Sequence, residues 1–274
     1  MDRSGKWEAV GPPSPFPLSL RVPSITTPAI VLHVMPYGET SAIVRLLARD
    51  LGLTSGIARG TRRARSRIGS RLDLFGAGDV TLLVKAHRDL HPLTHFELTS
   101  AHGGLAADVE RFASASALCE LALKCAPADP QPAAYDAASA GLDALENAPA
   151  DIVPAVALLA CWGLVVALGF SPVLDRCVVC GEPVRGGVAF SPAQGGALCP
   201  VHRRGMLTSR LPDDAAAALQ SFVHGQLPGA ALDARHAAAH RRLLLSFIRY
   251  HLAENRALPA MAFWDAESWN TTSS

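Results

Sequence analysis

The chain has 274 residues, of which 49% are hydrophobic and 18% are charged. A chain of this length and composition can bury a large apolar core, which excludes a wholly disordered protein and predicts about two domains. The net charge is only +1, but residues 1–100 hold 13 Lys and Arg against 8 Asp and Glu, whereas the remaining residues hold 12 against 16. The basic front suggests a polyanionic partner for that half of the chain.

The first 27 residues combine charged side chains with five prolines and lack the apolar segment that a secretion signal requires. This composition predicts a flexible Pro-rich extension over residues 1–27. The chain also has six cysteines. Without a secretion signal, cysteines in a chain of this length indicate an intracellular protein rather than a disulfide scaffold, so we expect a cytoplasmic location.

Five short apolar runs separated by turn residues follow the extension. The predicted strands lie at 30–32, 42–44, 56–58, 80–84 and 93–98. The turn signals between them lie at 36–38, 50–52, 60, 76–78 and 89. Five short strands spaced in this way over residues 28–100 favour a small closed barrel such as an OB-fold, although an SH3-like barrel would give nearly the same pattern.

The apolar spacing changes to that of helices after residue 104. Helices are predicted at about 105–124, 132–146, 152–169, 213–226 and 233–254. Residues 175–205 interrupt the helices with a segment that is rich in Cys, Gly and Pro and too short to form a core of its own. The expected fold class is therefore α+β, with an N-terminal OB-fold β-barrel at 28–100 and an all-α domain at 101–274 that carries an inserted zinc hairpin.

One apolar stretch, residues 152–174, is long enough to cross a bilayer and contains no charge. Pro154, Gly163 and Gly169 interrupt it, and no Lys and Arg cluster or aromatic pair flanks both of its ends. We therefore expect a buried central helix and no membrane partner.

The inserted segment contains two pairs of metal-binding residues. Cys177 and Cys180 form the first pair, and Cys199 and His202 follow after eighteen residues. A two-residue spacer lets one tight turn present both of its ligands to the same ion, so the four residues are predicted to bind one zinc ion per chain. Four protein ligands leave no open position for an activated water, which makes the site structural. A redox dithiol at the first pair, or three incidental cysteines, would leave the second pair unexplained.

A loop between two predicted strands holds six arginines and no acidic residue. The arginines are Arg59, Arg62, Arg63, Arg65, Arg67 and Arg71. A charged loop of this kind is often a solvated surface. Here Ser, Thr and Gly residues alternate with the arginines, and their hydroxyl and backbone donors suit phosphate oxygens. We therefore predict that the loop contacts a nucleic-acid backbone.

Aromatic residues make up only 6% of the chain, so stacking surfaces for bases are scarce. Tyr37 lies in a predicted turn and is the candidate stacking platform, whereas Phe75 and Phe96 are expected in the core. Binding is therefore predicted to depend mainly on charge, with little sequence preference.

Residues for catalysis are not recognisable. His236 and His240 have the four-residue spacing of a metal pair, but no acid or third histidine completes a motif, so we expect surface histidines. The acids of the barrel are scattered singly, whereas metal-dependent nucleases and polymerases need clustered carboxylates. No catalytic residue is predicted, and the chain is not expected to be an enzyme.

Several segments form a series that can be compared with a known family. They are residues 31–44 with Pro36-Tyr37-Gly38-Glu39-Thr40-Ser41, residues 52–60, Ser66-Arg67-Ile68-Gly69, Leu90-His91-Pro92-Leu93-Thr94, residues 113–121, and Leu168-Gly169-Phe170-Ser171-Pro172 followed by 175–181. In this order they closely resemble RecO proteins, the bacterial DNA-repair and recombination mediators. The likeness covers about residue 28 to 255.

The resemblance implies an OB-fold joined to a helical domain with a zinc hairpin. It implies a mediator that binds single-stranded and double-stranded DNA, anneals complementary strands and works at the nucleoid. With RecR, such a protein loads the strand-exchange recombinase onto DNA coated by single-strand-binding protein, whose acidic tail it also binds. By analogy the arginine loop and Tyr37 are DNA-binding. The Pro-rich extension departs from the family pattern, and so does His202, where cysteine is common and where the change bears on zinc affinity.

Two alternatives stay open from the residues alone. One is a zinc-ribbon transcription factor, or an accessory subunit of a nucleic-acid enzyme, that uses the same barrel. The other is a purely structural protein-interaction module. The salt dependence of single-strand binding separates the second alternative from a DNA-binding protein, because a scaffold should show none.

Overall fold

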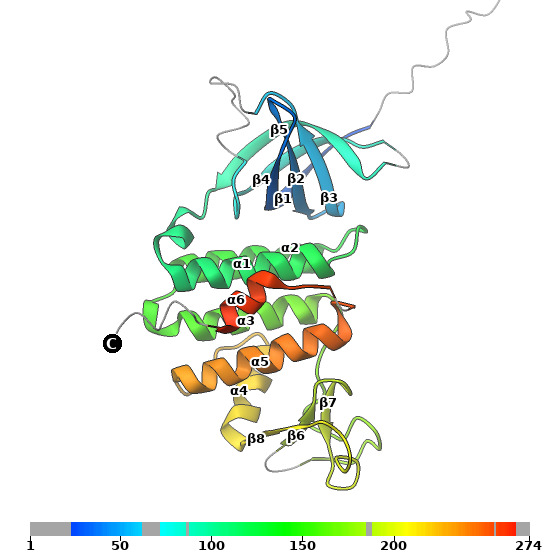
Figure 1. Cartoon of the computed structure of the whole chain (residues 1–274), viewed down its shortest axis with the longest axis vertical. Helices are drawn as coiled ribbons and strands as arrows, with labels where there is room; N and C mark the ends of the chain where they lie inside the picture. Colours follow the sequence, from blue (N-terminus) through cyan, green and yellow to red (C-terminus); the bar gives the residue numbers. More distant parts are fainter. Residues whose placement is uncertain (1–22, 62–71, 86–87, 185–187, 255, 267–274) are drawn as a thin grey trace, which may run out of the picture.

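The computed structural model describes residues 23–61, 72–85, 88–184, 188–254 and 256–266. These residues form a column of layers (Figure 1). A β-barrel lies at one end, helices fill the middle, and a small β-sheet lies at the other end. The chain runs from the barrel through the first helices to the small sheet at the far end, and its last three helices return toward the middle layer.

Five strands form the barrel. They are β1 (Ser24–Tyr37), β2 (Ser41–Ala48), β3 (Gly52–Ala58), β4 (Ala77–Leu83) and β5 (Leu90–Ser100). The barrel closes in the order β1-β2-β3-β5-β4. The pair β3 and β5 is parallel, and the other four pairs are antiparallel. The order and the parallel closing pair are those of an OB-fold, which confirms the predicted OB-like barrel.

The first strand begins inside the stretch 1–27 that was predicted as a flexible extension. The first four residues of β1 pair with the last four of β4, and the hydroxyl oxygens of Thr26 and Thr81 lie 2.9 Å apart. β-Branched Ile and Thr residues favour such pairing, and it outweighs the proline signal. The prediction was therefore wrong for residues 24–27, and residues 1–22 lie outside the described residues.

Alternate residues of β1 belong to two different cores. Ala29 and Val31 face the barrel interior with Phe96, whereas Ile30 and Leu32 pack into the core of the helices. β1 is therefore a wall shared by the barrel and the helical layers.

The two predicted core aromatics of the barrel region are both buried. Phe96 is 1% exposed and lies in the barrel core, and Phe75 is 3% exposed. Phe75 packs in the helical core, with its ring edge-on to Phe112 at a centroid distance of 5.5 Å. The prediction that Phe75 and Phe96 are core residues is confirmed.

Polar contacts also fix the barrel to the helices. The buried His102 ring places Nδ1 2.8 Å from the carbonyl oxygen of Phe75 and Nε2 2.9 Å from Oδ1 of Asp143. Gly52 has a φ of +68°, and a Cβ atom there would lie 2.2 Å from the carbonyl oxygen of Asp129. Only glycine fits this conformation and this close approach, so the turn before β3 can lie directly against the helical domain.

Six α-helices and two short 3₁₀ helices form the described middle layers. They are η1 (Gly103–Ala107), α1 (Val109–Cys125), α2 (Pro132–Asn147), η2 (Ala150–Ile152), α3 (Val153–Ala167), α4 (Asp213–Val223), α5 (Ala234–His251) and α6 (Pro259–Ala266). Asp108 and Asp233 cap α1 and α5 by accepting bonds from backbone N–H groups. The five predicted helices are present, but α6 was not predicted.

Helix α3 is apolar on every side because it packs on every side. It contacts α1, α2, α4 and α5, and Trp162, Leu164 and Val165 are fully buried. Residues 150–167 meet the length and hydropathy criteria for a membrane span, but the same criteria select the core helix of a folded domain. The packing agrees with the predicted central helix. Pro154 lies in its first turn, where proline is tolerated, so it does not interrupt the helix.

The inserted segment forms a small sheet with strand order β7-β6-β8. Its strands are β6 (Val188–Ser191), β7 (Gly196–Leu198) and β8 (Ser209–Leu211). The hairpin of β6 and β7 was expected between the two ligand pairs, whereas β8 was not predicted. The sheet leads directly into α4 and lies at the end of the column away from the barrel (Figure 1).

Candidate metal centre and nucleic-acid interface

The first ligand pair lies on a tight turn. The N–H of Gly181 donates to the carbonyl of Cys177 at 2.8 Å, and the N–H of Cys177 donates to the carbonyl of Glu182 at 2.8 Å. Gly181 has a φ of +77°, which the turn needs and glycine adopts without strain. This turn presents Cys177 and Cys180 on the same side.

The second pair follows β7 directly. The N–H of Arg203 donates to the carbonyl of Cys199 at 3.1 Å, which closes a turn that brings His202 back beside Cys199. The N–H of Val178 donates to the carbonyl of Ala197 at 3.0 Å, so the first turn is bonded to the strand that leads into the second. The sheet therefore holds the two pairs together.

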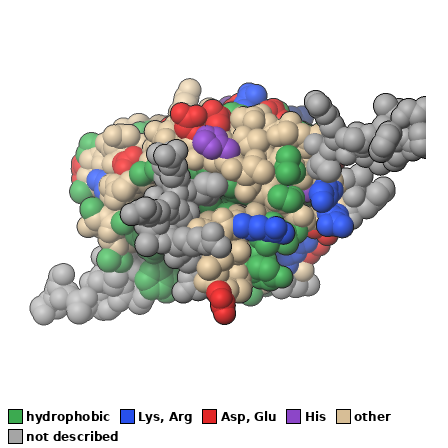
Figure 2. Space-filling model, turned by 90° about the horizontal axis from the view of Figure 1, so that it is seen from above, with side chains coloured by type: hydrophobic (Ala, Val, Ile, Leu, Met, Phe, Trp, Pro, Cys, Tyr) green, Lys and Arg blue, Asp and Glu red, His purple; other side chains and the backbone are tan. Residues whose placement is uncertain are grey.

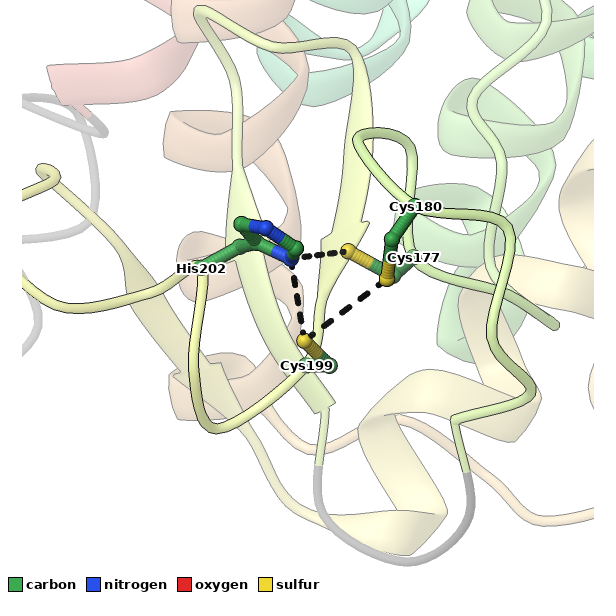
Figure 3. Close-up of side chains that lie close together, drawn as sticks. All are labelled: Cys177, Cys180, Cys199 and His202. Carbon is green, nitrogen blue, oxygen red and sulfur yellow. Dashed lines mark hydrogen bonds between the residues drawn. The ribbon is translucent and has the colours of Figure 1, made fainter.

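The four side chains point toward one another (Figure 3), and their ligand atoms all lie within 4.8 Å of each other. Nδ1 of His202 lies 3.2 Å from Sγ of Cys199 and 3.7 Å from Sγ of Cys177, and the sulfurs of Cys180 and Cys199 lie 3.9 Å apart. Tetrahedral bonds of the usual zinc lengths separate two sulfurs by about 3.8 Å and a sulfur and a nitrogen by about 3.6 Å. The cluster therefore fits one tetrahedral metal ion.

The surroundings of the cluster favour thiolates at two positions. Burial opposes ionisation of Cys177, but the N–H groups of Cys199 and Cys180 donate toward its sulfur and lower its pKa to about 6. The N–H of His202 similarly lowers the pKa of Cys199, against the effect of burial. Hydrogen bonding to the sulfurs of Cys199 and Cys177 raises the pKa of His202.

Cys180 differs from the other two cysteines. The N–H of Glu182 stabilises its thiolate, but burial and the neighbouring sulfurs of Cys177 and Cys199 outweigh this bond and raise its pKa. A third negative charge in so small a space is unfavourable unless a cation balances it. A bound dication supplies that balance, and its binding would release the remaining proton.

The candidate DNA-binding residues lie partly within the described ranges. Tyr37 is the last residue of β1, not part of the following turn as predicted, and 53% of it is exposed. It pairs with Ser41 at the start of β2, and the next residue of β2 pairs with Ala58, directly before the exposed Arg59. Tyr37 and Arg59 therefore lie at the same end of the barrel wall, on either side of β2.

The other arginines of the loop lie outside the described residues. They are Arg62, Arg63, Arg65, Arg67 and Arg71. Figure 2 looks down on the barrel end of the molecule, where the described Lys and Arg side chains lie in a few separate groups among neutral and acidic side chains. Thr61, at the start of the loop, donates its hydroxyl to the carbonyl of Thr40 in the turn after Tyr37. The loop therefore begins beside the candidate stacking residue.

The histidine pair on α5 was partly misjudged. His236 is half-buried and lies with Nδ1 2.9 Å from Oδ1 of Asp233, but His240 is only 2% exposed and is not a surface residue. The sequence contained the signal, because residues 237, 240 and 244 share one face at helical spacing and all three are buried. The prediction of surface histidines rested on the absence of a complete metal motif and did not take this face into account.

Two family models match the N-terminal and C-terminal parts of the chain. A family model described as recombination protein O, N terminal, matches residues 22–102, and a second, recombination protein O, C terminal, matches residues 106–258. The first match covers the barrel. The second covers α1 to α5 together with the Cys and His cluster.

Several proteins named DNA repair protein RecO are similar to this chain over most of their length. The DNA repair protein RecO of Anaeromyxobacter dehalogenans (strain 2CP-C) is 34% identical over 244 residues, which is 86% of this chain and 94% of that protein. The protein of the same name from Bifidobacterium animalis subsp. lactis is 38% identical over 175 residues, covering 63% and 71%. The one from Synechococcus elongatus is 32% identical over 245 residues, covering 83% and 90%.

Proposed function

Because this chain belongs to the RecO family of DNA repair proteins, we propose that it is a recombination mediator that binds single-stranded DNA and anneals complementary strands. The observation that carries the proposal is that an exposed aromatic, Tyr37, and Arg59 lie at the same end of an OB-like barrel. An aromatic platform beside basic side chains suits unpaired bases and their phosphates.

The proposal includes partners that follow from family membership. The chain binds double-stranded as well as single-stranded DNA, acts with RecR, and binds the acidic tail of single-strand-binding protein. It helps to load the strand-exchange recombinase onto DNA that this protein coats. It acts in the cytoplasm, at the nucleoid, and without a catalytic centre, since the acids of the barrel, such as Glu39, Asp50 and Asp79, are scattered along the sequence.

The metal of the cluster is proposed to be one structural zinc ion per chain. Three sulfurs and one imidazole nitrogen in a tetrahedral arrangement are the donors that zinc prefers. Cys177, Cys180, Cys199 and His202 would fill all four positions, so zinc would hold the hairpin and would not activate water. Zinc content of the purified full-length chain, expected at about one ion per chain, tests this assignment.

Salt-dependent binding to a single strand tests the DNA-binding proposal. Affinity for a fluorescent thymidine 30-mer is measured over a series of salt concentrations for the chain and for a triple variant, Arg62→Ala with Arg63→Ala and Arg65→Ala. Each phosphate contact contributes roughly 0.7 to the salt slope on single strands, so the variant should bind all sequences more weakly with a slope lower by about 2.

A triple variant with the same charge change serves as the control. Arg176, Arg204 and Arg235 are exposed and lie outside the barrel, and their replacement by Ala should leave the slope near that of the parent chain. Equal slopes for both triple variants would show that the loop is a solvated surface. A parent chain that does not bind the strand at all would overturn the proposed function itself.

A further inference from the structure

A cavity of about 380 Å³ lies between β8, α4 and α5, in the part of the molecule farthest from the barrel (Figure 1). Its polar lining includes Ser209 and Arg210 from β8 and His240, Arg242 and Ser246 from α5. The proposed DNA contacts at Tyr37 and Arg59 lie in the barrel, so this cavity is not part of that site.

The lining residue His240 is unusual because it is 2% exposed and neither ring nitrogen has a hydrogen-bond partner among the described residues. The ring of Phe222 packs edge-on against it at a centroid distance of 5.7 Å. Burial lowers the pKa of His240 to about 4, so its neutral ring offers one donor and one acceptor. Two unpaired polar atoms in a buried position are costly, and a ligand that shifts a lining side chain on entering the cavity would pair with one of them.

Charged and hydroxyl groups surround the opening of the cavity. Arg210 and Arg242 are exposed. Ser209 and Ser246 line both this cavity and a second cavity of about 270 Å³. Tyr250, 59% exposed, lines this second cavity. The two cavities thus form one groove with basic groups in one part and an exposed aromatic ring in the other.

Acidic groups lie near parts of the groove. Asp214 and Asp233 approach His236, at 3.9 Å and 2.9 Å, and Asp265 of α6 interacts with Arg242. The aspartates beside His236 make that part of the rim unfavourable for an anion. An anionic ligand would therefore lie away from His236, near Arg210, Arg242, Ser209 and Ser246.

We propose that this groove is a second contact for single-stranded nucleic acid and holds unpaired nucleotides. One base lies in the larger cavity against His240, its flanking phosphates contact Arg210 and Arg242, and the next base stacks on Tyr250. Arginine forks bind phosphate oxygens, and aromatic rings stack on bases of any sequence. The inference rests on the proposed function, because it assigns a further surface to the same ligand.

The chemistry of the cavity favours a base over the carboxylate of an acidic peptide. The edge of a nucleobase presents both donors and acceptors, so it can pair with either nitrogen of the neutral His240 ring, the donor or the acceptor. A carboxylate only accepts hydrogen bonds, so it can pair with the donor nitrogen alone. An acidic peptide is nevertheless a testable rival, because Arg210 and Arg242 would attract it.

The first experiment measures binding of the full-length, zinc-loaded chain to the thymidine 30-mer. The double variant Arg210→Ala with Arg242→Ala should weaken binding about tenfold and lower the salt slope by about 1.4, from two lost contacts of roughly 0.7 each. The matched control is Arg176→Ala with Arg235→Ala, which removes two exposed arginines that do not line the groove and should leave both quantities unchanged.

A second set of variants tests the base contacts. His240→Leu, which removes the unpaired nitrogens, should keep or raise the melting temperature of the parent and lower affinity for the strand. His240→Gln, which retains a donor and an acceptor, should restore most of the affinity. A strand with 5-iodouracil should form a photocrosslink to the peptide containing Tyr250. Tyr250→Ala should lower affinity about tenfold, within the range measured for single stacked bases.

The outcomes separate the two proposals. If the parent chain binds the strand, but the double variant behaves like its control and every crosslink lies in the barrel, the groove is not a nucleic-acid contact and the proposed function stands. If the parent does not bind the strand, the proposed function fails as well. If a hexa-aspartate peptide binds through Arg210 and Arg242 while the strand does not depend on them, the groove is a peptide site.

Discussion

The barrel and the hairpin sheet are both small β-structures, but they are stabilised in different ways. The barrel encloses its own apolar cluster, which includes Val31, Leu46, Leu82 and Phe96. The strands of the hairpin sheet have only three or four residues, and several of their buried side chains, such as Phe190, Ala197 and Leu211, belong to the core of the helices instead. Short strands without a core of their own need another source of stability. In this protein the helical core supplies part of it, and the proposed zinc ion at the Cys and His cluster would supply the rest.

Removal of the proposed metal should have the largest effect on stability, and the loss of structure should be confined to the hairpin. Structural zinc contributes about 10–16 kcal/mol to folding in zinc-finger peptides, because the site exists only in the folded state. In Cys180→Ser, or after chelation, residues 173–211 should become sensitive to proteases while the barrel keeps its protection from hydrogen exchange. Metal content and limited proteolysis measure these changes.

The control is Cys125→Ser, which removes a half-buried thiol that lies outside the cluster. It should retain the metal and the protease resistance of the parent. If Cys180→Ser also keeps an intact hairpin, the helical core alone stabilises the sheet, and the distinction between the two β-structures fails.

A core substitution in the barrel should have the second largest effect on stability. It should destabilise the barrel and leave the hairpin intact. Phe96 is 1% exposed, and Phe→Ala in a core costs about 3–5 kcal/mol. Phe96→Ala should therefore lower the denaturant midpoint and expose barrel amides to exchange, while metal content stays unchanged. Phe170, which is 37% exposed, provides the matched control, and Phe170→Ala should cost far less. Loss of metal from Phe96→Ala would show that the two regions unfold together.

Local sequence patterns predicted much of the architecture. Apolar runs and turn residues located the barrel strands, and the spacing within each pair located the metal cluster, because a two-residue spacer fixes the geometry of one turn. The early start of β1 was missed because residues 24–27 become a strand only through pairing with β4. The three residues of β8 and the eight of α6 are too short for a periodic signal.

The groove could not be predicted because it depends on contacts between distant residues. Arg210 and Arg242 line the same cavity only because the fold brings β8 and α5 to it, and nothing local in either segment specifies that arrangement. The burial of His240 was readable from the face it shares with residues 237 and 244. Its unpaired ring nitrogens were not, because they depend on which groups from other elements surround it.

Acid should destabilise the protein through His240. Burial lowers the pKa of His240 from 6.5 to about 4, so between these values the unfolded chain binds a proton that the folded chain does not. Stability is therefore complete above pH 6.5 and falls as pH decreases toward 4, by about 3 kcal/mol at about 1.4 kcal/mol per pKa unit. Denaturant unfolding at pH 7.5, 5.5 and 4.5 measures this loss.

Comparison with His240→Leu isolates this contribution. Protonation of the cluster thiolates at low pH affects the parent and the variant equally, so it cancels in the difference between them. The variant should lose less stability than the parent between pH 7.5 and 4.5. Identical pH profiles would mean that His240 titrates normally, and acid sensitivity would then originate in the metal hairpin alone.

The smallest effect should come from the ion pair that joins the barrel to α2. Nε of Arg49 lies 3.0 Å from Oδ1 of Asp136 and NH2 lies 3.1 Å from Oδ2, but the two side chains are 41% and 54% exposed. Exposed pairs contribute about 0.2–1 kcal/mol, because solvent screens them and both side chains lose freedom. A double-mutant cycle of Arg49→Ala and Asp136→Ala should therefore give a coupling energy below about 1 kcal/mol.

A small coupling energy is expected because other contacts already join the barrel to the helices. Ile30 and Leu32 of β1 are buried in the helical core, and the N–H of Leu53 donates to the carbonyl of Pro127 at 2.8 Å. These groups remain in place when Arg49 is replaced, so the barrel should keep its protection from hydrogen exchange in both single variants. A coupling energy of several kcal/mol would contradict this argument and would show that the barrel depends on this ion pair for its place in the fold.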